Sequence, residues 1–137
     1  YKYLYLLCCT IYISMAFRKL SIIIPAYNEG RTIHLILNKV KAVVLLDNIE
    51  KEIIIVNDCS KDNTEEAIKA YMAENSGLNI QYVKHEVNKG KGAALHTGIK
   101  KATGEYLIIQ DADLEYDPEE YNILLKPVVN GFADVVY

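Results

Sequence analysis

The sequence predicts an α/β fold, a doubly wound, mostly parallel sheet with flanking helices. Beyond residue 19, short β-branched apolar runs alternate with segments of helical periodicity. The first two runs are continuously apolar, as strands are when a parallel sheet is covered on both faces. Polar or glycine-rich loops follow four of the runs, and ligands of such sheets bind outside the carboxyl ends of the strands.

Four apolar runs are predicted to be strands, and a fifth begins near the end of the chain. They are residues 20–25, 52–56, 79–84, 105–110 and 133–137. The run 79–84 (NIQYVK) alternates apolar and polar residues, which indicates a strand nearer an edge. The run 133–137 has the composition of a strand cut off as it forms, so we expect the fold to be C-terminally incomplete.

Between these runs the sequence predicts helices with recognisable ends. The first helix carries an apolar stripe at helical spacing, formed by Ile33, Ile36, Leu37, Val40 and Val44. Asp62 and Glu65 have the spacing of a capping box at the start of the second helix. Asp117 and Pro118 supply an N-cap and a proline at the first position of a later helix. Pro127 is expected to end or kink that helix.

We expect one domain over residues 19–137, preceded by a non-core extension at 1–18. No charged residue occurs between residues 3 and 17, a stretch too short and too polar for a typical membrane helix. The order of Lys2, an apolar middle and small residues also fits a signal peptide. We favour a natural start at Met15, with a membrane anchor or a signal peptide as the alternatives.

Composition restricts the function classes. Of 137 residues, 51% are hydrophobic and 24% charged, which excludes disordered and low-complexity chains. A net charge of −3 provides no global basic field, so we expect no nucleic acid partner, and any phosphate must be bound locally. The three cysteines, Cys8, Cys9 and Cys59, support neither a disulfide framework nor a zinc site. A reducing, cytoplasmic compartment is therefore the default location.

The loops after the first four strands carry the candidate functional residues. They are residues 25–30, 57–62, 88–92 and 111–115. Taken singly, such Asp-, Asn- and Gly-containing loops are typical of turns and helix caps. Because the carboxyl ends of parallel strands meet at one edge of a sheet, their coincidence predicts a ligand site there, with helix N-termini offering N–H groups to an anion.

The loop after the fourth run suggests a metal site. Asp111 and Asp113 lie two residues apart where a buried strand ends, so both can reach one hard divalent cation, and Glu115 can join or orient them. Mg²⁺ or Mn²⁺ held there would neutralise a diphosphate leaving group. A calcium loop of the EF-hand type is rejected because Tyr116 and Asn122 occupy the positions that require glycine and glutamate.

The loop after the third run suggests a phosphate contact. Gly90 and Gly92 resemble a dinucleotide-binding fingerprint, but Leu95 stands at the third glycine position, and the spacing of a P-loop is absent. We interpret Lys89 and Lys91 as a small positive rim near a phosphate. A helix start with both lysines facing water is the alternative.

Four motifs together, at residues 24–30, 56–62, 88–94 and 111–118, resemble those of the family-two glycosyltransferases. Within that family the chain looks most like the dolichyl-phosphate mannose synthase and polyprenyl-phosphate glycosyltransferase branch. The resemblance covers residues 19–137. It implies the GT-A fold of nucleotide-diphospho-sugar transferases, with a nucleotide-sugar bound at the carboxyl edge of the sheet.

The resemblance also implies residue roles on the nucleotide side. Pro25, Tyr27 and Glu29 match the loop that holds the base and the ribose. Asp58, with Val56 before it, matches the position that contacts the base edge.

On the diphosphate side, Asp111 and Asp113 match the family's metal-binding pair, which makes them the candidate catalytic residues. Ala112 is expected to lie against the donor, and Glu115 to occupy a polar position beside the metal. The chain departs from the family pattern where Asn57 replaces a common aspartate and Cys59 a common glycine.

The activity implied is inverting transfer of a sugar from a donor of the GDP-mannose or UDP-glucose type to a lipid-phosphate or glycan acceptor. The branch resemblance favours a polyprenyl or dolichyl phosphate as the acceptor. The oxygen of such a phosphate is already anionic and needs no general base, whereas a hydroxyl acceptor would need a carboxylate base, and this difference leaves the choice of acceptor open. Such an acceptor also implies peripheral association with the cytoplasmic face of a membrane.

Two other functions stay open. The chain could be a non-catalytic nucleotide-binding fragment, inactive by itself. It could also be a nucleotidyltransferase on a similar α/β scaffold, although residues 25–31 offer little of the glycine- and arginine-rich phosphate loop such enzymes need.

Overall fold

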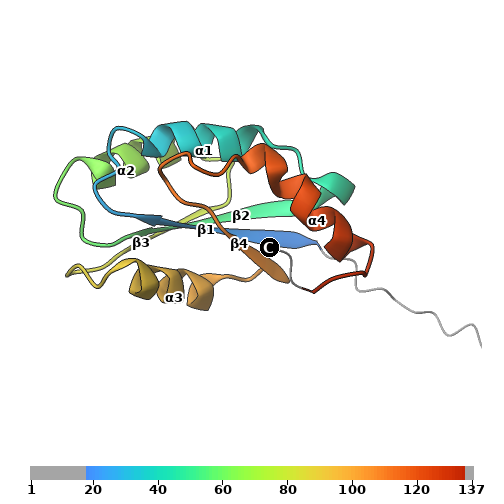
Figure 1. Ribbon diagram of the computed structural model, residues 1–137. Coiled ribbons are helices and arrows are strands. Elements are labelled where there is room, and N and C mark those ends of the chain that lie inside the picture. The colour runs from blue at the N-terminus through green and yellow to red at the C-terminus, as the bar shows by residue number, and fades with distance from the viewer. Residues whose placement is uncertain (1–17, 135–137) are drawn as a thin grey trace, which may run out of the picture.

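The computed structural model describes residues 18–134, which form a four-stranded parallel sheet (Figure 1). In chain order the strands are β1 (Lys19–Ala26), β2 (Glu50–Asn57), β3 (Ile80–Lys84) and β4 (Tyr106–Ile109). Their order across the sheet is β3-β2-β1-β4, and every neighbouring pair is parallel. The strand order reverses between β1 and β4, which is where doubly wound sheets bind their ligands.

Four α-helices cover both faces of the sheet. They are α1 (Ile33–Ala42), α2 (Thr64–Glu74), α3 (Lys91–Lys101) and α4 (Tyr121–Val129). Two short 3₁₀ helices, η1 (Leu46–Asn48) and η2 (Pro118–Glu120), precede β2 and α4. Helices α1, α2 and α4 lie on one face and α3 on the other (Figure 1). The predicted doubly wound α/β class is confirmed, as is the edge position of β3.

The isoleucine runs of β1 and β2 form the centre of the core. Ile22 and Ile55 are fully buried on the face that α1 covers, while Ile54 is buried on the opposite face beside Ala94 of α3. Helix α3 packs closely because it presents Gly98 to β1, where an added Cβ would lie 2.4 Å from the Cγ2 atom of Ile23. Burial on both faces explains why these strands are continuously apolar.

Two predicted helix features differ from the structure. Val44 does not belong to the apolar stripe of α1, because the helix ends at Ala42 and the Val44 side chain is 84% exposed. Helix α4 does not end at Pro127 but continues for two more residues to Val129, so the predicted end of the helix at this proline is wrong. The hydrogen bonds of the residues after Pro127 do not use the N–H that proline lacks. The predicted start of this segment is confirmed, since the Asp117 carboxylate accepts a hydrogen bond from the Glu119 N–H.

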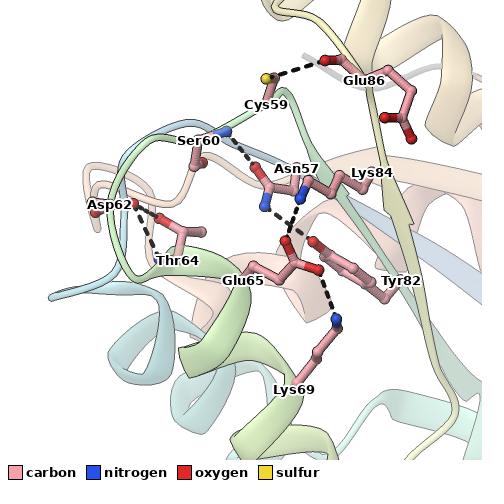
Figure 2. A network of polar contacts seen from close by, with 10 residues as sticks. All are labelled: Asn57, Cys59, Ser60, Asp62, Thr64, Glu65, Lys69, Tyr82, Lys84 and Glu86. Atoms are coloured by element: carbon pink, nitrogen blue, oxygen red, sulfur yellow. Dashed lines mark hydrogen bonds and ion pairs between the residues drawn. The ribbon is translucent and has the colours of Figure 1, made fainter.

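The capping box predicted for α2 is also wrong. The Glu65 carboxylate forms ion pairs with Lys69 and Lys84 rather than reaching back to the helix start (Figure 2). Asp62 does accept a hydrogen bond from the Thr64 N–H at 3.0 Å, but the N-cap of α2 is Asn63, whose side chain makes no capping hydrogen bond. The second carboxylate oxygen of Asp62 accepts from the Gly30 N–H at 3.0 Å, which joins two loops of the sheet edge.

Parts of three predictions lie outside the described residues. The extension predicted at 1–18 is described only at Arg18, and the fifth strand predicted at 133–137 only at its first two residues, which are irregular. Within the described residues, β4 is an edge strand, and Leu107 and Ile109 are each 43% exposed. No helix in the described part of the chain is long and apolar enough to cross a bilayer.

A buried carboxylate ties the amino end of the sheet together. Glu52 is 2% exposed and accepts hydrogen bonds from Ser21 Oγ (2.6 Å), Gln81 Nε2 (3.0 Å), Thr103 N (2.8 Å) and Thr103 Oγ1 (2.7 Å). Burial by itself raises the pKa of the Glu52 carboxyl, but the hydrogen bonds from Ser21 and Thr103 outweigh it and hold that pKa below its ordinary value. Glu52 therefore links β1, β2, β3 and the turn before β4.

Candidate functional site

A cleft of about 430 Å³ opens at the carboxyl ends of β1, β2 and β4, beside the N-terminus of α3. Eight residues predicted from the sequence line it: Pro25, Tyr27, Glu29, Asp58, Lys91, Asp111, Ala112 and Asp113. Ala26, Asn88, Gly90 and Ala94 complete the lining. The structure thus brings residues from all four predicted loops to one place, next to the point where the strand order reverses.

Three predicted residues do not line the cleft. Val56 is fully buried and packs with Ile54 and Ala94 beneath the site. Glu115 is exposed, and its backbone N–H donates to the Asp113 carboxylate at 3.1 Å. Lys89 is also exposed, so its predicted place in a positive rim is not supported, although its backbone N–H contributes to the site.

Hydrogen bonds connect the loop after β1 to the loop after β2 and to the start of α2. The Asn28 N–H donates to Ser60 Oγ (3.0 Å), and the Glu29 N–H donates to Thr64 Oγ1 (2.8 Å). The Asn28 side chain accepts in turn from the Lys61 N–H at 2.8 Å. These contacts hold the loop that carries Glu29 against the loop that carries Asp58, so the two cleft walls form one unit.

The two residues that depart from the family pattern, Asn57 and Cys59, both make contacts within the fold. Asn57 is fully buried, accepts from the Ser60 N–H at 2.9 Å and donates to the Tyr82 hydroxyl at 3.0 Å (Figure 2). An aspartate could not make the second contact by donating, so the asparagine uses both ends of its amide. Cys59 adopts a left-handed backbone conformation with φ of 58°, and its thiol donates to the Glu86 carbonyl at 3.5 Å. That conformation favours glycine.

Asp58 is the most enclosed carboxylate of the cleft, with 2% of its surface exposed. Its Oδ1 atom accepts from the Lys89 N–H (2.9 Å) and lies 2.7 Å from His85 Nδ1, and its Oδ2 atom accepts from the Gly90 N–H (2.7 Å). Burial raises the pKa of Asp58, but these hydrogen bonds outweigh it and hold the pKa below its ordinary value. Asp58 therefore carries its charge at neutral pH and anchors the loop before α3.

Asp111 faces Lys91 across the cleft. Lys91 Nζ lies 2.6 Å from Asp111 Oδ1, which raises the pKa of the lysine. Gly90, directly before α3, has a φ of 85°, a left-handed conformation that lets the chain turn sharply into the helix. The first turn of α3 then points its N–H groups toward the cleft, where an anion would be favoured.

Two residues that the sequence did not single out support the acidic loop. Gln110 is almost fully buried; its Nε2 donates to the Asp111 and Tyr116 carbonyls, and its Oε1 accepts from the Tyr121 hydroxyl at 2.7 Å. Burial raises the pKa of Tyr121, so its hydroxyl stays protonated and donates. For Gln110, the signal available in the sequence was a polar residue at the end of an apolar strand. His85, which follows β3, is another residue of the site that the sequence analysis did not single out.

The donor chemistry of the cleft fits a divalent cation. Asp111 and Asp113 both line the cleft and offer hard carboxylate oxygens, and Mg²⁺ is commonly bound by one or two carboxylates together with substrate phosphates. The described residues contain no group of three or more His, Cys, Asp or Glu side chains able to hold a metal. The arrangement therefore does not bring Glu115 in as a third ligand.

Comparison with known proteins identifies the family. A family model described as glycosyl transferase family 2 matches residues 21–137. The chain belongs to glycosyl transferase family 2. The sequence resemblance is thereby confirmed, and family 2 membership favours glycosyl transfer over the nucleotidyltransferase alternative.

Curated relatives of this family 2 chain include three named enzymes. It is 39% identical over 100 residues to poly-beta-1,6-N-acetyl-D-glucosamine synthase of Staphylococcus epidermidis (73% of this chain, 23% of the relative). It is 36% identical over 116 residues to undecaprenyl-phosphate 4-deoxy-4-formamido-L-arabinose transferase of Pseudomonas fluorescens (85% and 33%). It is 34% identical over 110 residues to dolichyl-phosphate beta-glucosyltransferase of Dictyostelium discoideum (75% and 33%). The chain thus spans about a quarter to a third of these relatives.

Solved structures resemble the family 2 chain in fold. The mannosyltransferase PcManGT of Pyrobaculum calidifontis, solved with GDP-Man and Mn²⁺, matches with a TM-score of 0.66 and 28% identity (76% of this chain, 30% of that one). S. aureus TarS in complex with UDP-GlcNAc matches with a TM-score of 0.67 and 29% identity (82% and 31%). The expected GT-A fold is confirmed by these likenesses.

Proposed function

We propose that residues 19–137 are the donor-binding part of an inverting glycosyltransferase that moves a sugar from a nucleotide-diphosphate sugar to a polyprenyl or dolichyl phosphate. One observation carries this proposal: residues from four separate loops line a single cleft, with a buried carboxylate at one wall and a pair of aspartates at another. A cleft that binds a charged diphosphate donor needs one region that neutralises the phosphate charge and another that recognises the nucleoside.

On the nucleoside side, Asp58 accepts an N–H donor of the base. Its lowered pKa keeps it ionised, and the fastened loops hold it in one orientation. Tyr27, which is 42% exposed at the cleft, and Pro25 provide apolar contact area for the base and the ribose. Glu29 lines the same wall and offers acceptor oxygens to the ribose hydroxyls.

On the diphosphate side, Lys91 and the N–H groups at the start of α3 attract the phosphate oxygens. Asp111 and Asp113 would hold Mg²⁺ or Mn²⁺, which when bound supplies positive charge next to the leaving diphosphate. Ala112 lies between them with 4% of its surface exposed, and its small side chain leaves room for the donor. Gln110 keeps this loop in place from below.

The acceptor is proposed from the relatives. Two of them are named for undecaprenyl phosphate and dolichyl phosphate, and the structural neighbours are named as complexes with GDP-Man or UDP-GlcNAc. A phosphate acceptor is already anionic at neutral pH, so its oxygen can attack the anomeric carbon without a general base. This acceptor favours action at the cytoplasmic face of a membrane, with peripheral association.

Transfer of radiolabelled sugar by the full-length protein tests the proposal. UDP-glucose and GDP-mannose are offered as donors with Mn²⁺, and polyprenyl phosphate and a soluble glycan as acceptors. Label extracted with the lipid supports the proposal, and label found only in the glycan overturns the acceptor assignment. Binding of a nucleoside diphosphate without transfer to either acceptor would favour the non-catalytic nucleotide-binding alternative. Absence of both binding and transfer would overturn the whole proposal.

A further inference from the structure

His85 is a buried histidine that the proposed donor chemistry leaves unused. It directly follows β3, is 7% exposed, and its backbone N–H donates to the Asn57 carbonyl at 2.9 Å. Its ring spans two partners, with Nδ1 2.7 Å from Asp58 Oδ1 and Nε2 2.8 Å from Thr97 Oγ1. His85 does not line the cleft, and of Asn57, Asp58 and Thr97, the three partners named, Asp58 alone lines it.

The hydrogen-bond partners of the His85 ring determine which ring nitrogen carries the proton. A carboxylate with a lowered pKa is ionised and can only accept, so the Nδ1 atom of His85 carries the proton and donates it to Asp58. In the neutral ring Nε2 then accepts from the Thr97 hydroxyl. The ring is thereby held at both ends, and it holds the plane of the Asp58 carboxylate in turn.

The contacts of Asp58 limit what else it can accept. Each carboxylate oxygen has two lone pairs. Oδ1 already accepts from His85 and from the Lys89 N–H, while Oδ2 accepts only from the Gly90 N–H. Among the contacts within residues 18–134, one acceptor position of the carboxylate therefore remains, on Oδ2.

We propose that His85 is a positioning residue that fixes Asp58 and restricts it to a single hydrogen bond from the nucleobase. A base with one N–H between two carbonyls, as in uracil, satisfies that position. Guanine presents two adjacent N–H donors, which need both carboxylate oxygens, so one donor would be left without a partner on burial. His85 thus makes the site favour uracil over guanine. This inference rests on the proposed function, in which Asp58 faces the base.

Two substitutions of His85 separate its two contacts. The amide nitrogen of His85→Asn falls near the place of Nδ1 and keeps the donor to Asp58, whereas that of His85→Gln falls near Nε2 and loses it. Affinities for UDP and GDP are measured by calorimetry on the full-length protein with Mn²⁺. We expect wild type to bind UDP at least about tenfold more tightly than GDP, a ratio that corresponds to one lost hydrogen bond to a charged group.

The variants should then diverge. His85→Asn should keep the ratio of the two affinities within about threefold of wild type, and His85→Gln should bring it down by about tenfold, the worth of that same hydrogen bond. His96→Gln is the control, because His96 is an exposed histidine on α3, and it should leave both affinities unchanged. A purely structural role for His85 would lower thermal stability without changing the ratio.

Other outcomes overturn one proposal or the other. Equal ratios in wild type, His85→Asn and His85→Gln would overturn the inference alone, as would GDP binding more tightly than UDP. Failure of wild type to bind either nucleotide would instead overturn the proposed function. If His85→Gln does not fold, 3-methyl-UDP on wild type provides a second measurement, because it lacks the base N–H. It should bind about tenfold more weakly than UDP, and equal binding would contradict the inference.

Discussion

The ammonium of Lys91 lies 2.6 Å from Oδ1 of Asp111, so the carboxylate best placed to hold a cation is already paired with one. The lysine extends from the first position of α3 and the aspartate from the loop after β4, and the two meet inside the cleft. A divalent ion bound at Asp111 would compete with Lys91 for this carboxylate, and a lysine released from Oδ1 would be available to a phosphate of the donor.

Lys91→Met should strengthen Mn²⁺ binding in the absence of nucleotide and weaken nucleoside diphosphate binding in its presence. Because the Lys91 side chain is 60% exposed, the pair is worth little, and we expect a change in Mn²⁺ affinity of about two- to fivefold. Calorimetric titration of Mn²⁺ measures it. Lys89→Met is the control, since Lys89 precedes the same helix but its side chain does not line the cleft. Equal effects of both substitutions would indicate a general charge effect instead.

Asp113 and Glu115 should differ sharply in metal dependence. Asp113→Ala, like Asp111→Ala, is expected to abolish Mn²⁺-dependent nucleotide binding, because it removes one of the two cleft aspartates proposed to hold the metal. Glu115→Gln should leave that binding unchanged, because the Glu115 side chain is exposed and outside the cleft. Calorimetry with and without Mn²⁺ compares the three variants, and a strong loss in Glu115→Gln would restore it as a ligand.

Glu52→Gln should destabilise the fold at neutral pH by about 1–3 kcal/mol, because an amide nitrogen would face the donors of Ser21, Gln81 and Thr103. The folded-state pKa of Glu52 lies below its ordinary value of 4.5, so its carboxylate contributes stability fully above that pH. This contribution is lost as the pH falls through the folded-state pKa.

Urea unfolding of wild type and Glu52→Gln at pH 7 and in the acid range tests this dependence. The difference in unfolding free energy should shrink as the pH falls, and a difference independent of pH would contradict the assignment. Glu50→Gln, at an exposed position of the same strand, serves as the control.

Gly104→Ala should destabilise the protein by about 1–3 kcal/mol through overpacking. An added Cβ would lie 2.6 Å from the Lys19 carbonyl oxygen and 2.9 Å from the Ser21 nitrogen, and these backbone atoms belong to a central strand that cannot move aside. Thermal unfolding measures the loss. Gly77→Ala is the matched control, since no atom lies within 4 Å of its added Cβ, and an equal loss there would remove the packing explanation.

Cys59→Gly should stabilise the protein by up to about 1 kcal/mol, because a left-handed φ of 58° costs a residue with a Cβ more than it costs glycine. Cys59→Val should be destabilising, since β-branched residues tolerate that conformation least. Chemical unfolding of both variants checks the order, and a gain in stability with valine would be inconsistent with the backbone argument.

Local patterns were sufficient to predict the sheet and the cleft. Continuous apolar runs predicted β1 and β2, because a strand covered on both faces buries most of its side chains and is therefore mainly apolar. Polar loops at the strand ends predicted a site, because parallel strands end at one edge. The same kind of pattern gave a wrong prediction at Val44, which was assigned to the apolar stripe of α1. Helical spacing of apolar residues continues in the sequence after the helix itself has ended.

The sequence by itself determined the fold class, the family and most of the residues that line the cleft, because these follow from periodicity and from motifs within single loops. Only the tertiary structure decided which partners those residues have. His85 contacts Asp58, which lies 27 residues away in the chain. Gln110 donates to the Asp111 carbonyl and accepts from the Tyr121 hydroxyl, while Glu115 does not line the cleft. Hydrogen bonds of that kind depend on where the packed sheet places each loop, which no local pattern encodes.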